Sequence, residues 1–218
     1  VPSDTWQSVG MDMVTDLPVT QEGFDSITVF VDRLSKMVRL APCKNNMDAP
    51  ELADLFLQHV FRSHGVPAQF VTDRGSLFVS RFWQAFSQKL GIGSAMSSAF
   101  HPQTDGNTER VNRIMEDVLR HYIDAAQTNW AALLPLVEFA INDSWQESIQ
   151  AIPFAVVYGR RPSLPLDSIL RGEEGNANSS LQCDSAHERA MLIADEVKKA
   201  KGAMNAAQQR QKAYADSK

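Results

Sequence analysis

The chain has 218 residues, of which 44% are hydrophobic and 22% charged, and its 21 Lys and Arg against 26 Asp and Glu give a formal net charge of −5 at pH 7. This composition is typical of a soluble globular protein and excludes disordered, collagen-like and disulfide-scaffold classes. Since no apolar run approaches the roughly 18–20 residues of a membrane span, and no basic start leads into an apolar stretch, we expect an intracellular protein without a membrane partner.

The first part of the chain predicts three neighbouring strands followed by a helix. Residues 7–17 alternate between apolar and polar as a strand does, and the β-branched run 26–31 and the segment 37–41 complete an antiparallel meander. Asp48 and Glu51 then form a capping box that opens a helix, and we expect this helix to end at His64 and Gly65.

Two further strands and a second helix follow. Residues 68–72 predict a short buried strand that runs into Asp73, Ser80 caps a helix over 81–90, and 94–98 predict another strand. This order of elements indicates an α/β fold with a mixed sheet and helices on its faces.

The next region is predicted to be helical. A turn-rich stretch precedes a long helix over 107–126, in which Glu109 lies on the side away from the apolar stripe. A helical region over 130–142 is predicted to be interrupted or restarted at Pro135, and a short helix over 153–158 begins with proline and ends at a glycine.

The charge is unevenly distributed and divides the chain. Residues 187–218 carry a net charge of +3, which leaves −8 for the residues before them. We predict a core domain over 1–170, a Gly-, Asn- and Ser-rich linker over 171–186, and an amphipathic helical extension over 187–218. Four apolar residues of the extension form a narrow seam suited to docking a protein partner, namely Ile193, Val197, Ala200 and Met204.

Three acidic residues lie where apolar patterning alone does not place them. Asp12 lies within a strand, Asp73 follows a buried strand, and Glu109 opens a helix. Each also has an ordinary structural interpretation, as an edge-strand, a turn and a helix-dipole residue respectively. Together they could supply the oxygen ligands that a pair of magnesium ions needs for phosphoryl transfer.

The spacing of the three carboxylates, with 60 and 35 residues between them, resembles the catalytic core of retroviral and LTR-retrotransposon integrases, which has an RNase H-like fold. The gypsy-type branch is the most similar, and the resemblance covers roughly residues 5–166. It rests on the segments Val31-Asp-Arg-Leu-Ser-Lys-Met37, His64-Gly-Val-Pro67, Val71-Thr-Asp-Arg-Gly75, His101-Pro-Gln-Thr-Asp-Gly-Asn-Thr-Glu-Arg-Val-Asn-Arg113, Leu133-Leu-Pro-Leu-Val-Glu-Phe-Ala140 and Val157-Tyr-Gly-Arg160.

The resemblance implies an RNase H-like mixed five-stranded sheet flanked by helices, with a C-terminal helical extension. It also implies that Asp12, Asp73 and Glu109 are the catalytic residues and the ligands of two magnesium or manganese ions. Asp16 and Asp32 are rivals for the first of these positions, although Asp16 lies beside a proline, where a turn is favoured. Residues that the resemblance or the surface chemistry assigns to DNA binding are His101, Gln103, Arg110, Asn112 and Arg113.

The chain also departs from the family pattern. Asn107 replaces a common Gln, and Ile152 replaces a small hydroxyl residue that would cap the helix at Pro153. The two cysteines, Cys43 and Cys183, have no paired spacing, so we expect free thiols and no zinc in this fragment. Family members carry a zinc domain before the core and a small basic domain after it, so this chain is expected to be an excised core.

The function implied is that of a polynucleotidyl transferase and endonuclease, which processes the 3′ end of retroelement DNA and joins it to target DNA. The expected partners are the retroelement DNA and the target DNA. The protein is expected to form a homodimer, and a tetramer on DNA. It is expected to be made as part of a polyprotein and to act in the nucleus. Two alternatives remain: a host-retained integrase-derived domain that binds protein or dimerises without catalysis, and an RNase H proper. The acidic charge implies that the fragment alone binds DNA weakly, since basic surface drives affinity.

Overall fold

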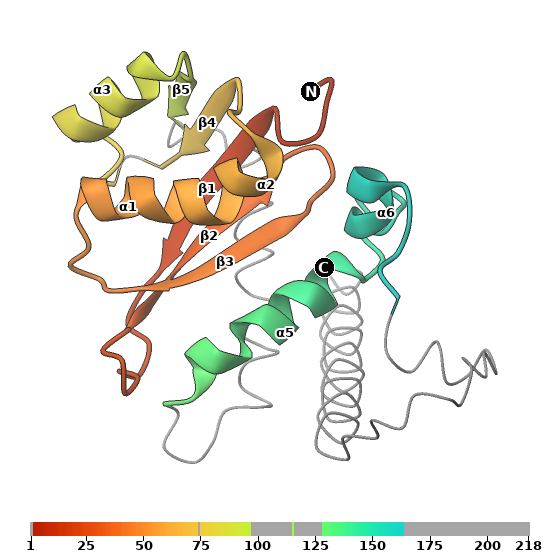
Figure 1. Cartoon of the computed structure of the whole chain (residues 1–218), viewed down its shortest axis with the longest axis horizontal. Coiled ribbons are helices and arrows are strands. Elements are labelled where there is room, and N and C mark those ends of the chain that lie inside the picture. The colour runs from red at the N-terminus through yellow and green to blue at the C-terminus, as the bar shows by residue number, and fades with distance from the viewer. Residues whose placement is uncertain (1, 74, 97–114, 116–127, 164–218) are drawn as a thin grey trace, which may run out of the picture.

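The computed structural model describes residues 2–73, 75–96, 115 and 128–163. The described strands form one five-stranded sheet in the order β3-β2-β1-β4-β5 (Figure 1). Their bounds are Ser8–Val14 for β1, Ser26–Asp32 for β2, Val38–Cys43 for β3, Gln69–Thr72 for β4 and Gly93–Met96 for β5. The first three strands are antiparallel, whereas β1, β4 and β5 are parallel, so the predicted mixed sheet is confirmed.

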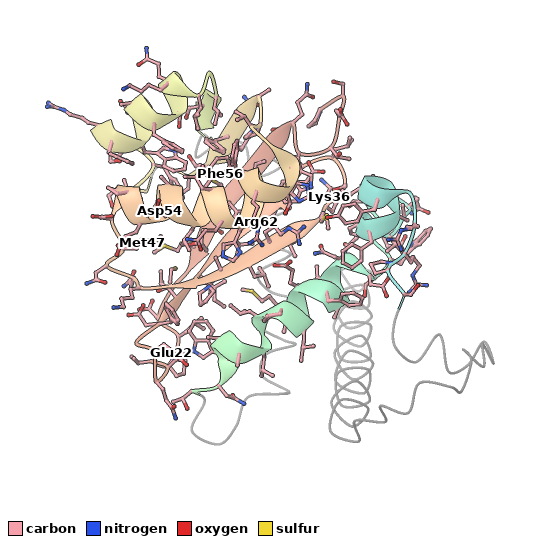
Figure 2. The ribbon with its side chains drawn as sticks, in the orientation of Figure 1. Glu22, Lys36, Met47, Asp54, Phe56 and Arg62 are labelled. Atoms are coloured by element: carbon pink, nitrogen blue, oxygen red, sulfur yellow. The ribbon has the colours of Figure 1, made fainter. Side chains whose placement is uncertain are left out.

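The sheet is buried on both faces by two apolar cores. The first core contains Phe56, Phe70 and Trp83. It lies between the sheet and two helices, α1 (Ala49–Phe56) and α3 (Arg81–Lys89). Phe56 of α1, labelled in Figure 2, is fully buried. Its ring packs edge-on against that of Phe70, with the ring centroids 5.1 Å apart. The second core joins Val29 of β2 to Leu134 of helix α5 (Trp130–Asn142). This burial on both faces explains why β2 reads as a continuous apolar run.

The capping signals in the sequence place the helix starts. Helix α1, Ala49–Phe56, has the predicted capping box, in which Asp48 and Glu51 each bond the other's backbone N–H. Helix α3, Arg81–Lys89, begins at Ser80, whose hydroxyl accepts the Trp83 N–H. Both starts follow from side chains that satisfy N–H groups with no partner inside the helix.

The helix expected to run on from α1 to His64 is interrupted by a wider turn. A π-helical segment, η1, spans Leu57–Phe61 and is followed by α2, Arg62–His64, which ends at Gly65 with φ 76°. The extra residue of the π turn leaves Val60 fully buried while Phe61 remains exposed. The end of this helical region is therefore as predicted, but its continuous α-helical character is not.

Helix α5, Trp130–Asn142, passes through Pro135 without a break, so the predicted interruption is wrong. Proline removes one hydrogen bond, but Pro135 is exposed, and water can therefore reach the carbonyl that lost its donor. The neighbouring Leu134 and Val137 are buried and hold the helix against the sheet. The short helix α6, Pro153–Tyr158, begins after Ile152, which supplies no side-chain cap, and ends at Gly159, both as expected.

Several predictions fall outside the described residues. These are Glu109, the five DNA-binding candidates, most of the helix over 107–126, Cys183, the linker and the C-terminal extension. Of the long helix the structure describes Met115, which is helical and fully buried in the second core. Cys43 is a buried free thiol, and burial raises its pKa. No helix among the described residues is long and apolar enough to cross a membrane.

Candidate metal-binding site at the ends of β1 and β4

The pairing of β1 with β4 aligns the first two carboxylates of the predicted triad. These strands are parallel, and their register runs from Ser8 opposite Gln69 to Met11 opposite Thr72. The next residue is Asp12 in β1 and Asp73 just beyond β4, so the two aspartates continue the register of the two strands. Neighbouring strands lie about 4.8 Å apart, and residues in register point to the same face. The register therefore places Asp12 and Asp73 in neighbouring positions on adjacent segments of chain.

Both carboxylates belong to the face of the sheet that carries the second core. Val9 and Phe70, which are paired in the register, pack in the first core on the other face. Asp12 is paired with Val29 of β2, a residue of the second core. Met115 is buried in that same core, six residues after Glu109. The third predicted carboxylate, Glu109, lies outside the described residues.

Backbone N–H groups hold one oxygen of each aspartate. The Met13 N–H donates to Asp12 Oδ1 at 2.8 Å, and the Gly75 N–H donates to Asp73 Oδ1 at 2.9 Å. Asp73 is exposed and Asp12 is partly buried. Paired carboxylates with preset orientation are the oxygen donors that a hard cation such as magnesium requires. Within the described ranges, no group of three or more metal-ligating side chains is assembled, and Glu109 lies outside those ranges.

The two rival aspartates have structural roles instead. Asp32 is fully buried and accepts the backbone N–H groups of Leu34 and Ser35 as well as the Ser35 hydroxyl. Three donors thereby stabilise a tight turn between β2 and β3. Asp16 is exposed, follows β1 and has φ 63°, and the structure assigns no turn to this residue.

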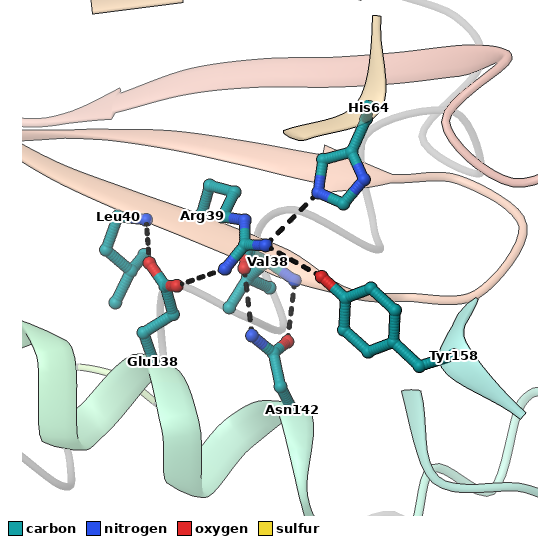
Figure 3. A network of polar contacts seen from close by, with 7 residues as sticks. All are labelled: Val38, Arg39, Leu40, His64, Glu138, Asn142 and Tyr158. Carbon is teal, nitrogen blue, oxygen red and sulfur yellow. Dashed lines mark hydrogen bonds and ion pairs between the residues drawn. The ribbon is translucent and has the colours of Figure 1, made fainter. Parts of the chain in front are cut away.

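A polar cluster that the sequence did not reveal lies at the opposite edge of the sheet, on β3 (Figure 3). Arg39 Nη1 donates to Glu138 Oε1 at 2.7 Å, and Arg39 Nη2 donates to Tyr158 Oη at 3.1 Å and lies 3.2 Å from His64 Nε2. Arg39 thus links α5, α2 and α6 to the edge strand. The His64 ring also stacks on Trp6, with centroids 4.1 Å apart.

The protonation state of His64 follows from this environment. Burial, together with the nearby positive charge of Arg39, lowers the pKa of His64 to about 4. The imidazole is therefore neutral at pH 7, and its Nε2 can accept the hydrogen bond from Arg39. This cluster connects elements of the fold and lies two strands away from the paired aspartates.

Helix α5 also closes the hydrogen-bonding edge of β3. The Asn142 side chain accepts the Val38 N–H at 2.8 Å and donates to the Val38 carbonyl at 3.0 Å, and Glu138 Oε2 accepts the Leu40 N–H at 2.8 Å (Figure 3). These two side chains act in place of a further strand, so this part of the edge cannot pair with another chain.

Comparisons with known proteins agree with this geometry. Residues 3–102 match the family model described as the integrase core domain. The chain is 33% identical over 175 residues to the transposon Tf2-3 polyprotein of Schizosaccharomyces pombe, and equally to the Tf2-4 polyprotein. The match covers 80% of this chain and 13% of each relative, so the chain spans a small part of these polyproteins.

Solved structures show the same fold. The catalytic core domain of HTLV-2 integrase, in complex with magnesium and in a trimeric form, has a TM-score of 0.56 at 19% identity, over 70% of this chain and 96% of that one. The catalytic core domain of BIV integrase has a TM-score of 0.53 at 20% identity, over 69% and 93% of the two chains. The predicted RNase H-like architecture of the sheet and its flanking helices is thereby confirmed.

Proposed function

We propose that this chain, which belongs to the integrase core domain family through residues 3–102, performs metal-dependent processing and strand transfer of retroelement DNA. The observation that carries the proposal is the register of β1 with β4, which places Asp12 within β1 beside Asp73, the residue that follows β4. Its relatives are transposon polyproteins. A retrotransposon requires an enzyme that inserts the DNA of the element into a host genome. The proposal joins this pairing of carboxylates to that family relationship.

The donor set fits divalent magnesium or manganese. Asp12 and Asp73 offer carboxylate oxygens from adjacent strands, and Glu109 would add a third carboxylate from the chain that leads to Met115. Two bound ions would activate the attacking oxygen and stabilise the leaving oxygen of an in-line displacement. The HTLV-2 catalytic core, whose structure contains magnesium, supports the choice of metal.

The proposed reaction has two steps at the same carboxylates. In the first, water attacks a phosphodiester near the 3′ end of the element DNA, and that ester bond breaks to leave a 3′-hydroxyl. In the second, the 3′-hydroxyl attacks a target phosphodiester, so that one ester bond forms as another breaks. Neither step passes through a covalent enzyme intermediate. The carboxylates of Asp12, Asp73 and Glu109 would hold the cations to which the reacting phosphate binds, because without cations these negative groups would repel the phosphate.

The residues around Glu109 are proposed to hold the DNA. Arg110 and Arg113 are one helical turn apart in the sequence and suit phosphate oxygens, with Asn112 between them. His101 and Gln103 precede the predicted helix in the sequence and are proposed to position the DNA beside the carboxylates. Support for these roles comes from their closeness in sequence to Glu109.

The wider biology is proposed from the relatives. Processing from a polyprotein follows from the Tf2 relatives, and a nuclear site of action follows from a chromosomal target. A homodimer, and a tetramer on DNA, are consistent with the dimeric HTLV-2 core and with the intasome of a simian T-cell lymphotropic virus. The division into a core over 1–170, a linker over 171–186 and an extension over 187–218 is also part of the proposal.

The test is strand transfer by a full-length protein that contains this chain, with a processed DNA end, a target plasmid and magnesium. Asp73→Asn and Glu109→Gln are expected to abolish the product, because each removes a negative ligand. Asp16→Asn is the matched control, since Asp16 is exposed and lies outside the strands, and asparagine tolerates its positive φ. Activity of Asp73→Asn equal to that of the wild type would overturn the proposal.

Strand transfer, cation binding and RNA cleavage, measured on the same protein, distinguish the two alternatives. A folded wild-type protein that binds no divalent cation and transfers no strand would favour a host-retained domain that binds protein partners. Cleavage of the RNA strand in an RNA–DNA hybrid, without transfer of DNA ends, would favour an RNase H.

A further inference from the structure

Gly75 contacts the candidate metal ligand Asp73 through its backbone. The Gly75 N–H donates to Asp73 Oδ1 at 2.9 Å, which closes a tight turn between the two residues. The second carboxylate oxygen of Asp73 accepts no hydrogen bond within the part of the chain that the structure describes. The turn therefore fixes one oxygen and leaves the other available to a cation.

The space around Gly75 excludes a side chain. A Cβ atom added to Gly75 would lie 2.9 Å from Asp73 Oδ1 and 3.6 Å from its Cγ. Carbon and oxygen atoms that are not bonded do not approach so closely, and one of them must move. The backbone of Gly75 does not have the positive φ found at Gly65 or Gly91, so an alanine would meet no strain from its own conformation. Among the described residues, the Asp73 carboxylate is the one group that comes closer than ordinary van der Waals contact to this Cβ position.

The backbone of Gly75 is fixed, so the carboxylate is the group that would yield. The Gly75 carbonyl accepts the N–H groups of Phe78 and Val79 at 3.1 and 3.3 Å. Phe78 is buried in the first core, with its ring 6.3 Å from that of Trp83. By contrast, the Asp73 carboxylate is the end of an exposed side chain and can rotate about its terminal bond.

We propose that Gly75 is a positioning residue, which sets the Asp73 carboxylate in the orientation that binds a divalent cation together with Asp12. Asp12 is held in the same way, because its Oδ1 accepts the Met13 N–H. The pair is thus oriented before any cation arrives. This inference rests on the proposed function and adds that the glycine of the Asp-Arg-Gly segment is required for the metal site, not for the fold.

The test measures metal binding and stability separately, on the whole chain. Gly75→Ala is expected to weaken manganese binding roughly 10- to 100-fold, as loss of an outer hydrogen bond to a metal ligand typically does. Its melting temperature is expected to stay at the wild-type value. Binding is followed by the electron paramagnetic resonance signal of free manganese in a titration with the metal alone, and stability by circular dichroism.

Gly91→Ala is the matched control. A Cβ at Gly91 would meet no atom within 4 Å, but its φ of 70° disfavours alanine. This variant is expected to melt at a lower temperature and to bind manganese as the wild type does. The two glycines should therefore show opposite patterns.

The outcomes distinguish this inference from the proposed function. Asp73→Asn should bind manganese weakly, and adding Gly75→Ala to it should weaken binding no further. If the wild type binds manganese and Gly75→Ala binds it equally well, the positioning role is refuted while the proposed function stands. If the wild type binds no manganese, both are refuted. A loss of binding in Gly75→Ala that accompanies a lower melting temperature would show a structural role and overturn the inference.

Discussion

The closure of the β3 edge by Asn142 gives a prediction with a calculable size. Asn142 is fully buried, and its amide satisfies both backbone polar groups of Val38, which is itself fully buried. Asn142→Ala would leave one buried N–H and one buried carbonyl without partners, each at a cost of about 1–3 kcal/mol. The expected loss is about 2–6 kcal/mol, a large part of the roughly 5–15 kcal/mol that stabilises a typical domain.

Urea denaturation followed by tryptophan fluorescence measures this loss. With a typical slope of about 1–3 kcal/mol per molar urea, the midpoint of Asn142→Ala should fall by roughly 1 M or more. Asn46→Ala is the control, because Asn46 is exposed and its truncation should change stability by no more than about 0.5 kcal/mol. A loss below about 1 kcal/mol in Asn142→Ala would refute the view that this side chain replaces a missing strand.

Two further predictions concern pH and DNA. The pKa of His64 is about 4 in the folded protein, against an ordinary value of 6.5 in the unfolded chain. Between these two pH values the unfolded chain binds a proton that the folded protein does not. The free energy of unfolding should therefore fall as the pH drops from about 6.5 to 4. His64→Gln should remove that part of the pH dependence in urea titrations, and an unchanged profile would show that another group is responsible. The second prediction follows from the net charge of −5: the chain should bind duplex DNA weakly at physiological salt and more tightly when magnesium is added. Fluorescence anisotropy measures this, and tight binding without divalent metal would contradict it.

Local signals in the sequence predicted the parts of the fold that depend on neighbouring residues. The capping box of Asp48 and Glu51, the Ser80 cap and the alternation along β1 all involve groups close together in the chain. The separation of Asp12 from Asp73 also proved informative, because it equals the offset between Met11 and Thr72 in the β1–β4 register. Residues separated by this number of positions are therefore next to each other in the β1–β4 register.

Features that depend on distant segments were not predicted. Asn142 and Val38 are 104 positions apart, and nothing local to either residue indicates that one completes the hydrogen bonds of the other. The helix through Pro135 persists because of burial on its other side, which overrides the local preference. Asp12 and Asp32 are both aspartates in strands, so the strand pattern does not distinguish a metal ligand from a structural residue. The structure distinguishes them, because Asp32 accepts three hydrogen bonds from the turn that follows it.

Binding of a divalent cation by Asp12 and Asp73 can be tested with a crystal of the chain soaked in manganese, with diffraction recorded at the manganese absorption edge. An anomalous peak is expected between Asp12 and Asp73, within about 2.0–2.6 Å of an oxygen of each, and it should be lost in Asp73→Asn. Manganese bound elsewhere on an ordered protein, with no peak between these two residues, would contradict it.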